Sequence, residues 1–326
     1  MDGLELQLLN DFQRGFPLCP EPFGEIARRC NIDPAKVIGA YRKLAAEGAV
    51  SRIGAVFAPN CVGASTLAAM RVPQERLSEV AQCVSAYHEV NHNYEREHDW
   101  NLWFVVTAPD KARLTDVLAE IERECGLGVM SLPLEEDFHI DLGFDLRDGT
   151  VPARGSRPAV GPLELTADES ALVAALQPGI PVAPRPYAEL GRRAGMTESG
   201  TIAQLQRWLG AGVIRRFGVV VRHHELGFGA NAMVVLDVPD PEVGRAGRRL
   251  AAAHGVTLCY RRPRALPQWR YNLFCMIHGR SREAVLAQLA PLCERGGLAD
   301  YPREVLFSCR RFKQRGARYV EEAAHG

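Results

Sequence analysis

The chain has 326 residues, of which 47% are hydrophobic and 24% charged, with a formal net charge of zero. This composition is typical of a globular protein and excludes intrinsic disorder, collagen and coiled coil as the main class. No apolar run reaches the roughly 18 residues of a membrane helix, and the acidic start of the chain lacks a secretory signal. We therefore expect a soluble cytoplasmic protein without a membrane partner.

The charges divide unevenly along the chain. Residues 1–150 contain 14 Lys and Arg against 24 Asp and Glu, whereas residues 151–326 contain 25 against 15. Of the 39 basic residues 35 are Arg, whose planar guanidinium suits carboxylate or phosphate groups. The second half is thus expected to bind planar anions, although mutual attraction of the two halves explains the same imbalance.

The first 57 residues read as three helices and a wing. Leu4, Leu8 and Leu9 have helical spacing, and a second helix is predicted near 22–30. Asp33 is the expected N-cap of a third helix, with Pro34 at its first position. Residues 48–57 read as a short β wing, so this segment is predicted to be a winged helix-turn-helix.

The following segment alternates strands and helices. Strands are predicted near 66–72, 90–96, 101–107 and 132–144, and helices near 74–85 and 110–125. Leu114, Val117, Leu118 and Ile121 form the apolar stripe of the second of these helices. This order is the ferredoxin-like βαββαβ pattern.

The whole unit occurs twice. Segments 26–32 and 52–56 align with 190–196 and 216–220, and later segments align in the same order with a five-residue insertion in copy two. The predicted fold class is α+β, a tandem duplication of a winged helix-turn-helix plus a ferredoxin-like unit. The predicted domains are winged helix 1 at 1–60, ferredoxin-like domain 1 at 61–146, a linker at 147–165, winged helix 2 at 166–224 and ferredoxin-like domain 2 at 225–320.

Polar side chains gather on the second strand of each predicted sheet. Because side chains alternate along a strand, His92, Tyr94, Arg96 and His98 are expected on one face. In copy two the same argument places Tyr260, Arg262 and Arg264 together, with Arg261 on the opposite face. Trp269 and Tyr271 follow in the next turn. Such a face is either a solvated surface or dimer interface, or a cleft lined by proton donors and guanidinium groups.

Several other functions are not favoured by the sequence. Nine cysteines without a Cys-x-x-Cys pair predict free thiols rather than a metal site, so no metal ligand is expected. The third helix of each copy carries few basic residues for a DNA groove, and the basic run at 310–318 lies outside the helix-turn-helix. DNA binding is therefore weakly supported.

The arrangement of a winged helix before βαββαβ resembles the Lrp/AsnC family. Within it, longer stretches resemble the sirohaem decarboxylases: 16–18, 52–57, 92–98 and 101–104 in copy one, and 231–235, 259–262, 271–279 and 312–319 in copy two. The chain is similar to two subunits of that family fused head to tail. It departs from the family pattern at His139, where copy two has Lys313.

The resemblance implies non-oxidative removal of the C12 and C18 acetate carboxyl groups of sirohaem, which gives 12,18-didecarboxysirohaem in haem d1 biosynthesis. It implies no cofactor beyond the iron tetrapyrrole of the substrate itself, and two halves that pair as a pseudo-heterodimer, with a further homodimer possible. Candidate proton donors are His92, Tyr94, His98, Tyr260 and His278. Candidate substrate-binding residues are Arg96, Arg261, Arg262, Arg264, Trp269, Asn272, Lys313 and Arg318.

Three questions remain open at the level of the sequence. The residues do not decide which half works, which side chain delivers the proton, or whether a histidine ligates the iron instead. An Lrp/AsnC-type transcriptional regulator, or a protein that binds sirohaem or haem without catalysis, is the alternative function.

Overall fold

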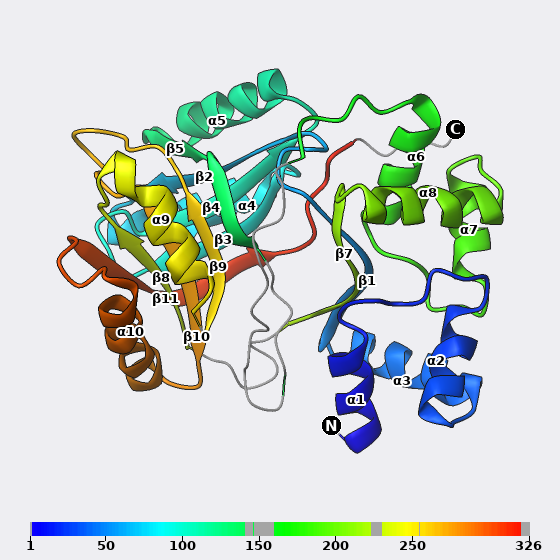
Figure 1. Ribbon diagram of the computed structural model, residues 1–326. Coiled ribbons are helices and arrows are strands. Elements are labelled where there is room, and N and C mark those ends of the chain that lie inside the picture. Colours follow the sequence, from blue (N-terminus) through cyan, green and yellow to red (C-terminus); the bar gives the residue numbers. More distant parts are fainter. Residues whose placement is uncertain (1, 141–145, 147–159, 223–229, 254, 321–326) are drawn as a thin grey trace. The chain divides into compact units, whose positions relative to one another are not determined.

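A computed structural model describes residues 2–140, 146, 160–222, 230–253 and 255–320. The chain folds into two compact units, and each unit combines parts of both sequence copies (Figure 1). The helix unit comprises Met1–Val62, Val160–Leu226 and Arg318–Gly326, and the sheet unit comprises Gly63–Ala159 and Gly227–Ala317. Most of the predicted linker, at 147–159, lies outside the described residues.

The helix unit contains three helices and one strand from each copy. They are α1 (Gly3–Asp11), α2 (Pro22–Cys30), α3 (Pro34–Ala46) and β1 (Val50–Phe57), then α6 (Ala167–Leu176), α7 (Pro186–Arg193), α8 (Glu198–Gly210) and β7 (Ile214–Val221). The predicted caps are present, because the Asp33 side chain accepts from the Ala35 amide at 2.7 Å and Thr197 from the Gly200 amide at 3.1 Å. The duplicated helix-turn-helix is confirmed.

The wing differs from the hairpin that a separate winged helix would form. Each copy supplies one strand, and β1 pairs antiparallel with β7 so that Gly54 lies opposite its own counterpart Gly218. A Cβ added to Gly218 would lie 2.3 Å from the main-chain oxygen of Gln13, so only glycine fits this crossing. The sequence predicts both wing strands, but it does not predict that β1 and β7 pair with each other.

The sheet unit contains both ferredoxin-like copies. Copy one supplies β2 (Ala64–Met70), η1 (Gln74–Arg76), α4 (Leu77–Ala86), β3 (Val90–Arg96), β4 (Leu102–Ala108), α5 (Lys111–Cys125), β5 (Val129–Pro133) and β6 (Glu136–Ile140). Copy two supplies β8 (Ala230–Leu236), α9 (Asp240–Ala251), β9 (Val256–Arg261), β10 (Leu273–Gly279), α10 (Arg282–Gly296) and β11 (Arg303–Gln314). The strand predicted over 132–144 is wrong as a single element: it is divided into β5 and β6, and residues 141–144 lie outside the described residues.

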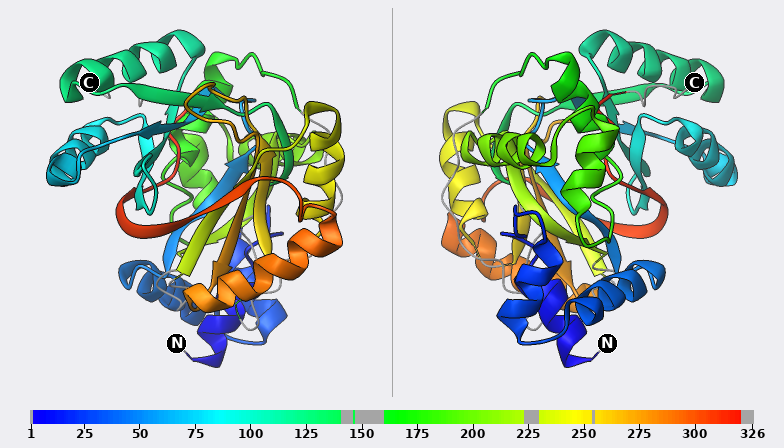
Figure 2. Two further views of the ribbon diagram at one scale, coloured as in Figure 1. Left: turned by 90° about the vertical axis from the view of Figure 1, so that its left-hand side faces the viewer. Right: turned by 90° about the vertical axis from the view of Figure 1, so that its right-hand side faces the viewer.

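One sheet runs through both copies in the order β5-β2-β4-β3-β11-β8-β10-β9-β6. The first half of β11 pairs with β8, and its second half crosses to β3 of copy one (Figure 2). Similarly, β5 pairs with β2 while β6 pairs with β9 of copy two. Since only two residues separate β5 from β6, the two ends of the strand order lie within about 10 Å of each other. The sheet is therefore curled until it nearly closes.

This curling divides the apolar residues into three clusters. One lies between the strands and helices of copy one, and a second between those of copy two. The third joins the helix-free faces of both copies and is rich in aromatic rings, with Trp103, Trp269, Tyr260 and Phe274 at its centre. No helix in the described part of the chain is long and apolar enough to cross a membrane.

Candidate functional site

Strand β3 carries three polar side chains on the helix-free face of the sheet. The His92 and Tyr94 rings lie nearly parallel with centroids 6.2 Å apart, and the Arg96 Cζ lies 5.8 Å from the Tyr94 ring centroid. A bulge between Val90 and His92 changes the register of β3 against β4. The three residues share a face, as strand alternation predicts.

Strand β9 and the residue that follows it repeat part of this arrangement. The Arg262 Cζ lies 4.6 Å from the Tyr260 ring centroid, and Tyr260 stacks on Phe274 at 5.8 Å. Arg264 does not join them. It lies beyond the end of β9, where it forms ion pairs with Asp237 and Asp240 at 2.8 Å.

Arg96 and Arg262 each donate a hydrogen bond to a strand of the opposite copy. The Arg96 Nη1 donates to the Leu306 carbonyl oxygen on β11 at 3.0 Å, and the Arg262 Nη1 donates to the Leu132 carbonyl oxygen on β5. These two carbonyl groups occupy matching positions in the duplicated unit. The two guanidinium groups are thus related by the internal symmetry of the sheet.

Neither buried guanidinium group has a carboxylate partner within the described residues. Arg96 is 7% exposed and Arg262 9% exposed, and the Nε atom of each has no hydrogen-bond partner among the described residues. Burial lowers the pKa of both groups. Burying a cation without a counter-ion is costly, so an anionic ligand at this face would recover part of that free energy.

His278 stands close to Arg96 on the same face. It follows Phe274 and Met276 at two-residue intervals on β10, and the Arg96 Nη2 lies 4.0 Å from the Met276 Sδ. Burial and the Arg96 charge lower the pKa of His278 to about 4, so its imidazole is neutral at pH 7. A negative ligand on Arg96 would reduce this effect and raise the pKa of His278.

The two symmetry-related positions are not equivalent in chemistry. When the two copies are aligned, His92 of copy one corresponds to Leu258 of copy two. His278 of copy two corresponds to Thr107 of copy one. His92, Tyr94 and His278 are half-buried, whereas Tyr260 and Trp269 are buried in the aromatic cluster. Tyr94 and His278 therefore lie beside Arg96, and His92 stacks on Tyr94.

His98, a predicted proton donor, is engaged at both ring nitrogens. Its Nδ1 accepts from the Trp100 amide at 2.8 Å, and its Nε2 lies 2.6 Å from the Glu304 carboxylate. The Tyr271 hydroxyl donates to the other oxygen of Glu304 at 2.7 Å. Because Nδ1 accepts a hydrogen bond, Nε2 carries the proton, and this His–Glu–Tyr group joins the two copies.

Two predicted substrate ligands contact main-chain groups instead. Asn272 accepts from the Val238 amide at 3.0 Å and donates to its carbonyl oxygen at 2.9 Å, as Asn101 does with Val72 in copy one. The Lys313 Nζ donates to the carbonyl oxygens of residues 85 and 87, at the end of α4 and hence on the helix side of the sheet. These contacts indicate structural roles.

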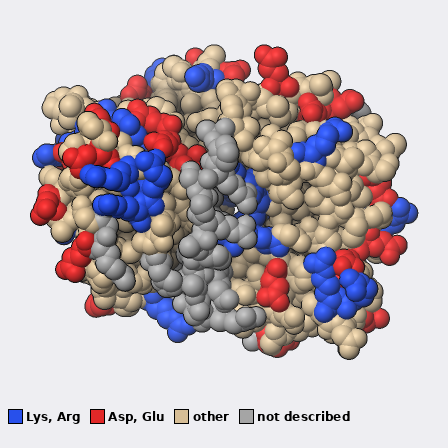
Figure 3. Space-filling model, in the orientation of Figure 1, with Lys and Arg blue, Asp and Glu red and all other residues tan. Residues whose placement is uncertain are grey.

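Three further predicted ligands have other partners or lie elsewhere in the chain. Arg261 pairs with Glu135 at 2.8 Å, and Trp269 packs against Trp103 with ring centroids 5.1 Å apart. Arg318 is exposed and belongs to the segment after β11 that joins the helix unit. On the face drawn in Figure 3, basic and acidic side chains are interspersed rather than forming a single basic patch.

Sequence reasoning missed the partners that come from the opposite copy. Met276 and the two leucine carbonyl groups reach the arginines because β11 and the β5–β6 pair cross between copies. The matching pairs 138–139 and 312–313 indicated a common last strand, but no signal told which sheet it would join.

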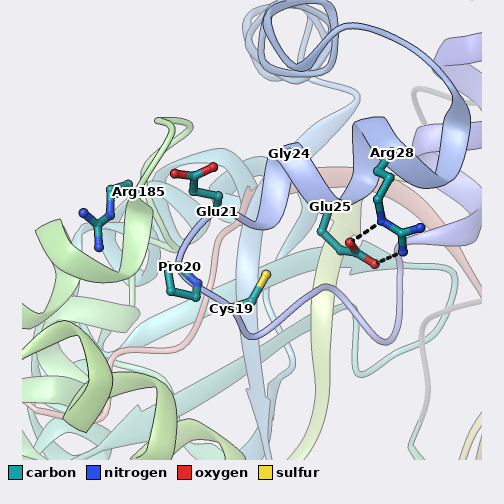
Figure 4. A pocket seen from close by; sticks show the side chains of 7 residues that line it. All are labelled: Cys19, Pro20, Glu21, Gly24, Glu25, Arg28 and Arg185. Carbon is teal, nitrogen blue, oxygen red and sulfur yellow. Dashed lines mark hydrogen bonds and ion pairs between the residues drawn. The ribbon is translucent and has the colours of Figure 1, made fainter.

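A pocket in the helix unit is a weaker candidate for an anion site. It is lined by Cys19, Pro20, Glu21, Gly24, Glu25, Arg28 and Arg185 (Figure 4). Arg28 already binds both oxygens of Glu25 at 2.9 Å, and Arg185 pairs with Glu198. These arginines are neutralised by carboxylates of the chain itself. Among the described residues no group of three or more His, Cys, Asp or Glu could hold a metal ion.

The fold and the site together define a duplicated Lrp/AsnC-like protein whose curled sheet encloses two buried arginines. Family comparison agrees with this class. An AsnC-like ligand binding domain matches residues 62–139 and 225–313, and a siroheme decarboxylase NirDL-like HTH domain matches residues 5–50 and 169–215.

The chain belongs to the sirohaem decarboxylase family, whose enzymes are carboxy-lyases. It is 46% identical to the siroheme decarboxylase NirDL subunit of Paracoccus denitrificans, with 99% of both chains covered. The NirD subunit of Pseudomonas aeruginosa is 50% identical, with 97% of it matched by 45% of this chain. A crystal structure of a siroheme decarboxylase NirDL with an iron-uroporphyrin III analogue has a TM-score of 0.70 and 30% identity, and covers 98% of this chain and 94% of that one.

Proposed function

We propose that this enzyme removes the C12 and C18 acetate carboxyl groups of sirohaem, without oxidation, to give 12,18-didecarboxysirohaem for haem d1 biosynthesis. Family membership supports the reaction class. The observation that carries the site is the pair of buried guanidinium groups without carboxylate partners in the described part of the chain. Sirohaem bears eight carboxylates and so supplies the missing counter-charge.

The site around Arg96 is proposed as the working one. His92, Tyr94 and His278 are the candidate proton donors there, whereas the matching positions around Arg262 are occupied by Leu258 and Thr107. The second arginine then serves as an anchoring or structural position. The working half is therefore proposed to be the one whose site is built on β3 and β10.

Arg96 is proposed to hold a carboxylate that does not react. Binding the reacting carboxylate to a guanidinium would stabilise the ground state and raise the barrier to losing its charge as carbon dioxide. The reacting acetate is instead proposed to lie against the apolar residues of the aromatic cluster, out of contact with the guanidinium, where it is poorly solvated. The binding energy from the anchored carboxylate would then position the reacting group.

The chemical step needs a proton but no further cofactor. The bond between the methylene and the carboxyl carbon breaks and carbon dioxide leaves. The electron pair of the broken bond is delocalised into the macrocycle. A proton delivered to the methylene carbon then gives a methyl group. We propose His278 as the donor: substrate carboxylates near Arg96 raise its pKa from about 4, so that substrate binding itself protonates it.

Anaerobic incubation of the purified chain with sirohaem, followed by mass spectrometry of the tetrapyrrole, tests the function. Loss of two carbon dioxide units per molecule is expected. His278→Gln should bind sirohaem but lose turnover, whereas the surface variant Arg28→Ala should match the wild type. Unchanged ligand mass with a shifted Soret band would instead indicate a carrier, and salt-dependent DNA binding without turnover would indicate a regulator.

A further inference from the structure

We propose that Cys83 and Cys125 form a reversible disulfide site on the outer helix layer of copy one. Cys83 lies on α4 and Cys125 is the last residue of α5, and their Sγ atoms are 3.6 Å apart. Both are free thiols in this structure. Since the sulfur atoms of a disulfide are about 2 Å apart, a small movement of two thiols already in contact closes the bond.

The surroundings give the two thiols different roles. Cys83 is half-buried, so a small oxidant reaches it, while Cys125 is 3% exposed and lies beneath it. Gly126, with φ at 65°, ends α5 directly after Cys125 and gives this end of the helix freedom to adjust. Cys83 is therefore the thiol that reacts first, and Cys125 the thiol that resolves.

A peroxide is the oxidant class that balances the reaction. The Cys83 thiolate attacks hydrogen peroxide, the O–O bond breaks, and sulfenic acid and hydroxide form. The Cys125 thiol then attacks the sulfenic sulfur, water leaves, and the disulfide forms. Burial, the neighbouring thiol and the Glu124 carboxylate raise the pKa of Cys83 to about 12. As long as the pH is below that value, the thiolate fraction and with it the rate of oxidation should rise about tenfold for each unit by which the pH is raised.

The disulfide would clamp the two helices behind the strand that carries the candidate site. Asn93 on β3 donates from its side chain to the Ala81 carbonyl oxygen and the Ser85 hydroxyl, on either side of Cys83 along α4. Roughly forty residues lie between the two cysteines, and a cross-link over such a loop restricts the unfolded chain. The oxidised protein should therefore unfold at a higher temperature than the reduced one.

Peptide mapping of the full chain tests the site. The protein is treated with hydrogen peroxide at pH 8.5, alkylated and digested, and its cross-linked peptides are identified by mass spectrometry. A peptide joining Cys83 to Cys125 is expected, lost with dithiothreitol and absent in Cys83→Ser. The exposed Cys309 provides the matched control, because Cys309→Ser should retain the link.

Two measurements complete the test. Cys125→Ser should accumulate sulfenic acid at Cys83, and the Tm of the oxidised wild type should exceed that of the reduced protein by roughly 5 °C. The Tm of Cys83→Ser should not respond to the oxidant. Links formed by other cysteines in place of this one, Cys83 oxidised without a link in the wild type, or an unchanged Tm of the linked protein would each overturn the proposal.

Discussion

Replacing Arg96 by methionine separates substrate binding from folding. A hydrogen bond between a guanidinium and a carboxylate contributes about 1.5–3 kcal/mol, so its loss should weaken sirohaem binding by roughly 10- to 150-fold. The folded protein loses the bond from Arg96 to the Leu306 carbonyl oxygen, which costs about 1–2 kcal/mol. The substitution also removes a buried cation that has no carboxylate partner in the described structure. Removing its desolvation penalty stabilises the fold and offsets part of the cost of the lost hydrogen bond.

Arg264→Met is the matched control and should behave in the opposite way. Arg264 bonds to Asp237, Asp240 and two carbonyl oxygens, and its loss leaves this network incomplete. We expect it to lower the free energy of unfolding by at least about 2 kcal/mol. The affinity for sirohaem should stay within about twofold of the wild type, because these contacts are satisfied within the protein.

Soret titration measures the affinity of both variants, and urea unfolding of the ligand-free protein measures their stability. The two variants should show opposite patterns, with Arg96→Met losing affinity and Arg264→Met losing stability. If Arg96→Met binds sirohaem as tightly as the wild type, the buried guanidinium does not hold the substrate. If it instead loses more than about 3 kcal/mol of stability, Arg96 is primarily structural.

Three further predictions concern the fold and its pH dependence. The pKa of His278 is about 4 in the folded chain against 6.5 for an ordinary histidine, so the unfolded chain takes up more protons as pH falls through this window. The free energy of unfolding, measured by urea titration, should therefore fall between pH 6.5 and 4. In His278→Gln it should fall less steeply with pH, and equal pH slopes in the two proteins would contradict a lowered pKa of His278. Gly218→Ala should lower the free energy of unfolding by about 3 kcal/mol or more, because its Cβ would lie 2.3 Å from a main-chain oxygen. Gly39→Ala is the control: it lies within a helix with nothing within 4 Å of the added Cβ, and it should raise the free energy of unfolding by about 0.5–1 kcal/mol. Asn272→Ala should destabilise the protein by about 2 kcal/mol, as Asn101→Ala should, without changing sirohaem affinity; a selective loss of affinity in Asn272→Ala would restore its predicted role as a ligand.

The duplication and the local elements could be predicted because their causes are local. The caps at Asp33 and Thr197 depend on residues within one turn, and strand alternation places His92, Tyr94 and Arg96 on one face. These rules act over a few residues and leave a pattern in the sequence itself. They therefore hold without knowledge of what packs against the element.

The exchange of strands between copies could not be predicted in the same way. β11 is one uninterrupted strand over Arg303–Gln314, yet its first part pairs with β8 of its own copy and its second part with β3. Only the neighbouring Leu306 and Phe307 are buried in β11, and the part that pairs with β3 contains two register shifts, so no apolar alternation in the sequence specifies its partner. For this reason the carbonyl partners of the two arginines, and the cross-copy contact of His98 with Glu304, appear only in three dimensions.

The internal symmetry of the chain allows structural and chemical roles to be compared within one molecule. Residues that hold the fold have a counterpart in the other copy: Asn101 matches Asn272, and the Arg96 contact to a strand carbonyl matches that of Arg262. His92 and His278 have no such counterpart; His278 lies near Arg96, and His92 stacks on Tyr94 of the same strand. Because the fold forms at the second position without them, their presence at the first is better explained by chemistry than by packing. The same comparison shows why the two arginines alone do not identify the working half, and why the histidines do so in our proposal.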